Sequence, residues 1–248
     1  MKLFEAKTPL PLFYVGPDIT QGPLPAIFYF ALSAEESLLT DPFNQPLSFW
    51  ASLPVRIFSV DLPYHGKGFS STEAMHAWSK AMEQEDLFLE RFIADLIQTA
   101  SHLFSTPAVD KERIATAGLS RGGFIASHLA TGFPEIATLL AFAPMTLLES
   151  IKEFPSSSPF IERTALSHLQ DRLAHKKIKI YMGNRDTRVG TDPCYHWFRS
   201  LVESAYAQKI RSPLIELVIK PSIGYLGHGT AKETFQEGAN WLIEQLSL

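Results

Sequence analysis

The sequence predicts an α/β fold in which helices cover both faces of a mostly parallel sheet. Strands are expected at short apolar runs rich in β-branched or aromatic residues, namely 26–30, 55–60, 113–117, 138–142, 178–182 and 214–219. Stretches with helical spacing lie between several of these runs, and such alternation favours a parallel sheet that is buried on both faces. Because 46% of the 248 residues are hydrophobic, one sizeable core can be filled. We therefore expect one domain that spans residues 1–248.

Four helices are expected from their spacing of apolar residues, at 85–104, 122–131, 194–206 and 232–246. The clearest is 85–104, in which a single stripe carries Leu89, Ile93, Leu96, Ile97, Ala100 and Leu103. Glu85 and Asp86 suit its first turn, because negative charge is favourable beside the free N–H groups of a helix start.

Two segments depart from the regular alternation. Short apolar pieces around Pro9 and Pro11 fit an antiparallel hairpin at an edge of the sheet, where proline is tolerated. Residues 145–177 contain a stretch rich in proline and serine at 154–160, followed by a helical pattern of leucines. This segment is a candidate lid insertion, and an ordinary connecting loop with one surface helix is the alternative.

Charge and cysteine content narrow the classes of partner and site. The formal net charge is −4 without a run of like charges, so neither a nucleic acid nor a membrane is an expected partner. The first seven residues are too charged for a secretion signal and no segment is long enough to span a bilayer, so a cytoplasmic protein is expected. Cys194 is the only cysteine and the eight histidines form no close pair of ligands, so no disulfide, metal or other cofactor is expected.

The most informative segment is the turn Gly118-Leu119-Ser120-Arg121-Gly122, between a predicted strand and a predicted helix. A serine hydroxyl becomes a useful nucleophile only when it is exposed beside a base, with backbone N–H groups near the developing oxyanion. Small neighbours allow the strained turn that exposes it, and the following helix adds favourable partial positive charge. Ser120 is therefore a candidate nucleophile, with a solvated serine in a tight glycine turn as the alternative.

The chain resembles the α/β-hydrolase superfamily, which includes serine esterases, dienelactone hydrolases and the catalytic domains of prolyl oligopeptidases. The resemblance covers residues 26–246 and is carried by four segments: 118–122, 61–66, 183–189 and 227–229. The segment 61–66 is similar to a turn common in the superfamily, with Tyr64 in place of a glycine, and its His65 is expected to be structural. The resemblance implies the α/β-hydrolase fold.

The resemblance also implies roles for residues of the other segments. Ser120, Asp186 and His228 occur in the chain order of nucleophile, acid and base that this fold uses. His228 would then take the serine proton while Asp186 orients the imidazole, and Asp192 is the reserve acid. Two backbone N–H groups, those of Leu32 and Arg121, are expected to form the oxyanion hole.

Several other side chains have competing interpretations. The Arg121 side chain is expected to contact the surface or the lid, and binding of a substrate carboxylate is the alternative. His102 and His128 lie on predicted helices, where surface or packing roles are expected. Candidate linings of an apolar pocket, with core or lid packing as the alternative, are Phe69, Trp78, Phe154 and Tyr225.

These features together favour a serine hydrolase that cleaves the carboxylic ester of a small molecule through an acyl-enzyme, without a cofactor. A thioesterase or a peptidase of the prolyl oligopeptidase kind is the nearest alternative. A binding protein that keeps the fold without catalysis is the alternative from another class, because function resides in sites rather than in architecture. The oligomeric state is left open.

Overall fold

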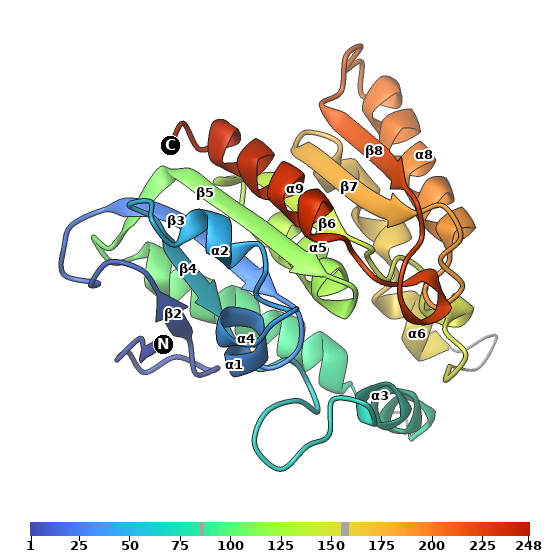
Figure 1. Ribbon diagram of the computed structural model, residues 1–248, viewed down its shortest axis with the longest axis horizontal. Coiled ribbons are helices and arrows are strands. Elements are labelled where there is room, and N and C mark those ends of the chain that lie inside the picture. Colours follow the sequence, from blue (N-terminus) through green and yellow to red (C-terminus); the bar gives the residue numbers. More distant parts are fainter. Residues whose placement is uncertain (85–86, 155–158) are drawn as a thin grey trace.

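Figure 1 shows the protein as a computed structural model, which describes residues 1–84, 87–154 and 159–248. The eight strands of the described residues form one sheet in the order β1-β2-β4-β3-β5-β6-β7-β8. Six of them run parallel, with the bounds β3 (Leu24–Phe30), β4 (Arg56–Ser59), β5 (Val109–Leu119), β6 (Ile136–Phe142), β7 (Lys177–Gly183) and β8 (Ile215–Lys220). The predicted mostly parallel sheet is confirmed.

The first two strands form the predicted hairpin at one edge of the sheet. β1 (Lys2–Leu3) pairs antiparallel with β2 (Phe13–Val15), and β2 pairs antiparallel with β4. Pro9 and Pro11 lie between the two strands, where neither has to donate a hydrogen bond to the sheet.

The helices of the described chain are α1 (Ala34–Leu39), α2 (Leu47–Trp50), α3 (Ala74–Glu83), α4 (Phe88–Phe104), α5 (Arg121–Gly132), α6 (Pro159–Arg163), α7 (Gln170–Leu173), α8 (Thr191–Ala207) and α9 (Lys232–Gln245). The four predicted helices correspond to α4, α5, α8 and α9. The expected first turn of α4, at positions 85 and 86, lies outside the described residues. In the parts of the chain that the structure describes, no helix is both long and apolar enough to cross a membrane.

The sheet separates two apolar cores. Successive side chains of a strand point to opposite faces, so Phe28 packs on one side while Ile27 and Tyr29 pack on the other. The core around Phe28 is closed by α3, α4, α5 and α8, and the second core by α1, α2 and α9, which lie in front of the sheet in Figure 1. Burial on both faces explains why the central strands are apolar without alternation.

The described parts of 145–177 pack into the core around Phe28, the one that α5 and α8 help to close. They contain the 3₁₀ turns Leu148–Ser150 and Leu166–Leu169 besides α6 and α7. Their buried apolar side chains are Met145, Leu148, Ile151, Phe154, Ile161, Leu166, Leu169, Leu173 and Ala174. Residues 155–158 of the stretch rich in proline and serine lie outside the described residues, and a lid function stays a prediction.

Candidate active site

The predicted site residues lie at one edge of the sheet because the strands that precede them are parallel. Ser120 follows β5, Asp186 follows β7 and His228 follows β8. Leu32 lies just after β3 in the same edge region. Carboxyl ends of parallel strands meet at one edge of an open sheet, which is where such folds place their ligands.

Ser120 occupies a strained turn between β5 and α5. Its φ of 56° and ψ of −118° fall in a region that non-glycine residues rarely adopt, at a cost of about 1–3 kcal/mol. Four backbone hydrogen bonds hold the turn. Ser120 N–H donates to Phe142 O at 2.9 Å, and Ser120 O accepts from the N–H groups of Gly123 at 3.0 Å, Met145 at 3.1 Å and Phe124 at 3.4 Å. The surrounding backbone therefore enforces the conformation that exposes the hydroxyl.

Two glycines of the turn are required by the close approach of backbones. A Cβ atom on Gly122 would lie 1.9 Å from Phe30 O, and one on Gly118 would lie 2.2 Å from the carbonyl carbon of Gly122. Because real Cβ atoms do not approach backbone this closely, any larger residue forces α5 away from β3 and β5. The pattern Gly-x-Ser-x-Gly is thus explained by packing around the serine.

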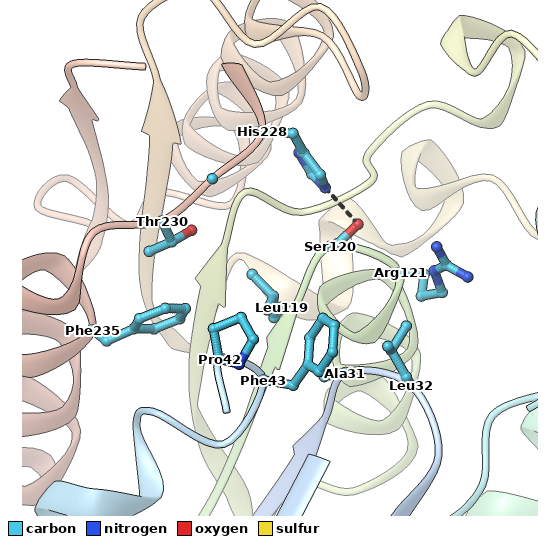
Figure 2. Close-up of a pocket in the computed structure, with 11 residues that line it drawn as sticks. Ala31, Leu32, Pro42, Phe43, Leu119, Ser120, Arg121, His228, Thr230 and Phe235 are labelled. Carbon is cyan, nitrogen blue, oxygen red and sulfur yellow. Dashed lines mark hydrogen bonds between the residues drawn. The ribbon is translucent and has the colours of Figure 1, made fainter. Parts of the chain in front are cut away.

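Three side chains form a continuous hydrogen-bonded chain. His228 Nδ1 lies 2.7 Å from Asp186 Oδ2, and His228 Nε2 lies 2.8 Å from Ser120 Oγ, the contact drawn as a dashed line in Figure 2. An ionised carboxylate can only accept, so Nδ1 carries the hydrogen and donates it to Asp186. Nε2 is then the acceptor for the Ser120 hydroxyl. Asp192, the reserve acid, is exposed in the first turn of α8.

The Asp186 carboxylate is buried but well solvated by protein groups. Its side chain is 0% exposed, and Oδ1 accepts the N–H groups of Arg188 at 2.9 Å and Val189 at 3.0 Å. Burial alone raises the pKa of a carboxyl, but the hydrogen bond and charge of His228, together with these two amides, hold the pKa of Asp186 below its ordinary value. Asp186 is therefore ionised at neutral pH.

The loop that carries Asp186 is tied to its neighbours on two sides. Thr187 donates both its N–H, at 2.9 Å, and its hydroxyl, at 3.0 Å, to Leu226 O, just before His228. Arg188 forms a bidentate ion pair with Glu153, with N–O distances of 2.8 and 3.0 Å. The relative position of Asp186 and His228 is thereby set by contacts outside the pair itself.

The two predicted oxyanion donors differ in their present partners. Arg121 N–H lies in the first turn of α5, where helical amides lack an intrahelical acceptor, and no acceptor for it occurs among the described residues. Leu32 N–H donates to Ser37 Oγ at 3.2 Å, and the same oxygen accepts Ala31 N–H at 2.9 Å. The Leu32 N–H thus already donates a hydrogen bond to the Ser37 side chain of α1, whereas the Arg121 N–H is available to a substrate oxygen.

The Arg121 side chain has a different contact from the one expected. It is half-buried, and Nη1 donates to His65 Nε2 at 2.9 Å and to Ser71 O at 3.3 Å, so it binds the loop at 61–71 rather than the surface or the lid segment. Burial and the neighbouring Arg188 lower the pKa of Arg121 to about 10, which still leaves it charged at neutral pH. The contact differs from the expected one because the local pattern around His65 predicts only a turn residue, whereas in the structure its Nε2 accepts a hydrogen bond from the Arg121 side chain.

His65 itself is neutral and structural. It is 4% exposed, and Nδ1 donates to Pro63 O at 2.8 Å, which leaves Nε2 to accept from Arg121. Burial and the charge of Arg121 lower the pKa of His65 to about 4. Tyr64, which replaces a glycine, has a φ of 58° and packs its ring edge against Phe69 and Phe88.

A cavity of about 260 Å³ opens beside Ser120 and His228. Its walls come from the loop after β3, the α1–α2 connection, the nucleophile turn and the start of α9, as Figure 2 shows, and consist of Ala31, Leu32, Pro42, Phe43, Leu119, Ser120, Arg121, His228, Gly229, Thr230 and Phe235. The side chains are mostly apolar. The cavity can therefore hold an apolar part of a molecule whose reacting atom lies at Ser120.

None of the four aromatic residues suggested as pocket linings contacts this cavity. Trp78 and Phe154 are buried in the core around Phe28, whereas Phe69 is exposed on a loop and Tyr225 is exposed in the 3₁₀ turn Tyr225–Gly227. The aromatic walls are instead Phe43 and Phe235. Sequence reasoning missed them because one follows a very short helix and the other is an ordinary apolar position of α9.

The remaining histidines proposed as structural lie apart from the serine. His102 is exposed on α4 with Nδ1 donating to Gln98 O at 2.9 Å. His128 is buried on α5, where Nε2 donates to Thr164 O at 3.0 Å. Across residues 1–84, 87–154 and 159–248, no group of three or more His, Cys, Asp or Glu side chains is placed to hold a metal ion.

The sheet order and the similar solved structures show that the protein has the α/β-hydrolase fold. Residues 9–147, more than half of the chain, match the family described as acetyl xylan esterase (AXE1), and the chain belongs to this family of esterases. No curated protein matches the sequence.

Solved structures of similar fold cover the chain almost completely. A putative dipeptidyl aminopeptidase IV from Bacteroides ovatus has a TM-score of 0.71 and 16% identity over 99% of this chain and 35% of its own. TT1662 from Thermus thermophilus has a TM-score of 0.69 and 14% identity, with 100% and 98% covered. Est1E from Butyrivibrio proteoclasticus, solved with ferulic acid bound, has a TM-score of 0.66 and 14% identity, with both chains covered by 100%. The chain thus spans about a third of the first of these proteins, and identities this low show a shared fold alone.

Proposed function

We propose that this protein is a serine hydrolase that cleaves the carboxylic ester of a small molecule through an acyl-enzyme intermediate. The observation that carries the proposal is the hydrogen-bonded chain from Ser120 Oγ through His228 to Asp186, with distances of 2.8 and 2.7 Å. Membership of an esterase family supports the same reaction class.

In the first half of the reaction, Ser120 Oγ bonds to the carbonyl carbon while its proton passes to His228 Nε2. The imidazolium that forms is stabilised by the buried Asp186 carboxylate at 2.7 Å. Because Nδ1 donates its hydrogen to Asp186, the imidazole is held in the tautomer that leaves Nε2 free to act as base, and the two amides that Asp186 accepts keep its carboxylate in place.

The carbonyl oxygen gains negative charge as the new bond forms, and the Arg121 N–H is the donor available to it. Leu32 N–H is the second donor of this proposal, and the oxyanion replaces Ser37 Oγ as its acceptor. The exchange is favourable because a charged acceptor forms a stronger hydrogen bond than a hydroxyl, and the existing bond is long at 3.2 Å.

The tetrahedral intermediate then releases the alcohol, which takes the proton from His228 Nε2 and leaves an acyl group on Ser120 Oγ. Water attacks this acyl group with His228 as base, and the second tetrahedral intermediate releases the acid and restores the serine hydroxyl. His228 carries every proton between Ser120, the leaving alcohol and water, while Asp186 stays ionised and stabilises the imidazolium, so the steps need no cofactor.

Labelling with a fluorophosphonate tests the nucleophile directly, because the reagent phosphonylates an activated serine. Wild-type protein is expected to gain one label on Ser120 and to hydrolyse short p-nitrophenyl esters, and both properties are expected to be lost in Ser120→Ala. Ser105→Ala, which alters an exposed serine after α4, is the matched control and is expected to behave as wild type. Folded wild-type protein that takes no label would refute the proposal.

A peptidase is the second candidate because one structural neighbour is named as a putative dipeptidyl aminopeptidase. This chain spans only 35% of that protein, so the resemblance concerns one part of it. Parallel assays of acyl esters, acyl thioesters and aminoacyl-proline amides on one preparation distinguish the candidates by their kcat/KM values. A binding protein without catalysis would show none of these activities, and hydrogen-bonding distances along the triad favour turnover.

A further inference from the structure

The cavity beside Ser120 is much larger than an acetyl group requires. Its volume is about 260 Å³. An apolar protein cavity of about 150 Å³ is known to hold benzene, a molecule of six carbon atoms. By proportion, this cavity accommodates about six to ten non-hydrogen atoms. A methyl group would leave most of that volume without contacts.

The walls of the cavity are apolar and fixed in place. Phe235 is 2% exposed and packs edge-on against Phe142, with ring centroids 4.8 Å apart. Phe43 is half-buried, and its carbonyl accepts the Tyr29 hydroxyl at 2.5 Å, which anchors the α1–α2 connection to β3. The Phe235 ring and the anchored backbone at Phe43 therefore present a preformed wall, which favours binding of an apolar group with little reorganisation of the site.

The charged group nearest to the cavity does not face its interior. Figure 2 shows the Arg121 guanidinium directed away from Phe43 and Phe235. Its Nη1 donates to His65 Nε2 at 2.9 Å. The remaining polar side chain on the wall, apart from Ser120 and His228, is the neutral Thr230. An ionised group placed here would lose its hydration without gaining an opposite charge, which is costly.

We propose that this cavity binds a neutral apolar group of about six to ten non-hydrogen atoms, carried on one side of the scissile ester bond. Esters with such a group are then better substrates than simple acetates. This inference rests on the proposed esterase function and names the substrate class for the same site. The burial of apolar surface against Phe43 and Phe235 supplies the preference.

Two series of esters test the proposal and identify the side of the ester that enters the cavity. One series varies the acyl group of methyl esters from acetate through butyrate to hexanoate and cyclohexylacetate. The other varies the alcohol of acetates from methyl through butyl to hexyl and cyclohexylmethyl. Proton release is followed for each. In one of the two series, kcat/KM is expected to rise at least tenfold from methyl acetate to the largest group, because each added methylene contributes in an apolar pocket.

Charge and size of the cavity are tested separately. Monomethyl adipate, which carries a carboxylate in place of the terminal methyl of methyl hexanoate, is expected to have a kcat/KM at least tenfold below that of methyl hexanoate if the acyl group enters. If the alcohol group enters instead, the carboxylate of monohexyl succinate lies outside the cavity, and its kcat/KM is expected to stay within threefold of that of hexyl acetate. Phe43→Trp, which reduces the cavity volume, is expected to lower the ratio of kcat/KM for the largest ester to kcat/KM for methyl acetate at least fivefold. Phe43→Ala enlarges the cavity and is expected to move the highest kcat/KM to esters with larger groups.

Tyr206→Ala, at an exposed position of α8, is the control and is expected to keep both the ratio and the rates. Equal or falling kcat/KM along both series, in protein that still labels at Ser120, would overturn the size preference alone. A ratio that Phe43→Trp leaves unchanged would also overturn it, because the cavity would then not be the binding surface. Protein that neither labels nor hydrolyses any ester would instead overturn the proposed function and this inference with it.

Discussion

Mild acid is expected to destabilise the folded protein through two buried histidines. His65 and His128 are 4% and 6% exposed, and in each case burial is the largest cause that lowers the pKa to about 4. The charge of Arg121 lowers the pKa of His65 further, and that of Arg172 acts similarly on His128. Both imidazoles are hydrogen-bonded in their neutral form, so protonation disrupts their surroundings.

The sign and size of the effect follow from proton linkage. Between pH of about 6.5, the ordinary pKa of histidine, and about 4, the unfolded chain binds protons that the folded chain does not. Stability is therefore fully present above pH of about 6.5 and decreases as the pH falls toward 4. At pH of about 5 the loss is about 2 kcal/mol for each histidine, hence about 4 kcal/mol for both. Carboxyls with lowered pKa values, such as Asp186, titrate below this range.

Urea unfolding at pH 7.5, 6.5, 6 and 5, followed by circular dichroism, measures the free energy of unfolding at each pH. The double variant His65→Gln with His128→Gln keeps neutral side chains that can form hydrogen bonds and removes both titrations. Its stability is expected to change much less over this range than that of the wild type. Equal decreases in the two proteins would show that other groups cause the acid sensitivity and that these histidines are not buried in neutral form.

Two further predictions concern the triad and the turn that exposes Ser120. Asp186→Asn is expected to lower kcat for ester hydrolysis by about 10⁴-fold with little loss of fold, because the amide favours the wrong tautomer of His228. Steady-state kinetics measures kcat and circular dichroism checks the fold. A near-normal kcat would contradict the assigned role of Asp186. Gly122→Ala is expected to destabilise the protein by at least about 1–3 kcal/mol and to abolish labelling of Ser120, because its Cβ would lie 1.9 Å from Phe30 O. Thermal unfolding measures the change in stability. An unchanged Tm would refute the packing argument.

The regular elements were predictable because their patterns are local and repeated. The parallel strands and the long helices α4, α5, α8 and α9 show the expected spacing over many residues. Helices α1 and α2 have six and four residues, too few for a periodic signal, and they were not predicted. β5 begins at Val109, earlier than expected, because the charged residues at 110–113 interrupt the apolar run although they belong to the strand.

The candidate site was predictable only in part. Ser120 is marked by its own neighbours, since glycines at 118 and 122 are needed for a tight turn. Asp186 is favoured over the reserve acid Asp192 by the superfamily resemblance alone, because both residues follow β7 within a few positions. In the structure the Asp186 carboxylate lies 2.7 Å from His228, whereas Asp192 is exposed in the first turn of α8. Only the course of the loop distinguishes them.

The sequence by itself placed Ser120, Asp186 and His228 in this order along the chain, each after a predicted strand. Hydrophobic periodicity predicts the strands and the glycines predict the serine turn, whereas the roles of Asp186 and His228 were implied by the resemblance to α/β hydrolases. The tertiary structure decided what surrounds the serine: Phe43 and Phe235 as cavity walls, His65 as the acceptor for Arg121, and Ser37 as the acceptor for Leu32 N–H. These contacts join residues from separate elements, so no local pattern encodes them; they arise when packing brings the elements together at one edge of the sheet.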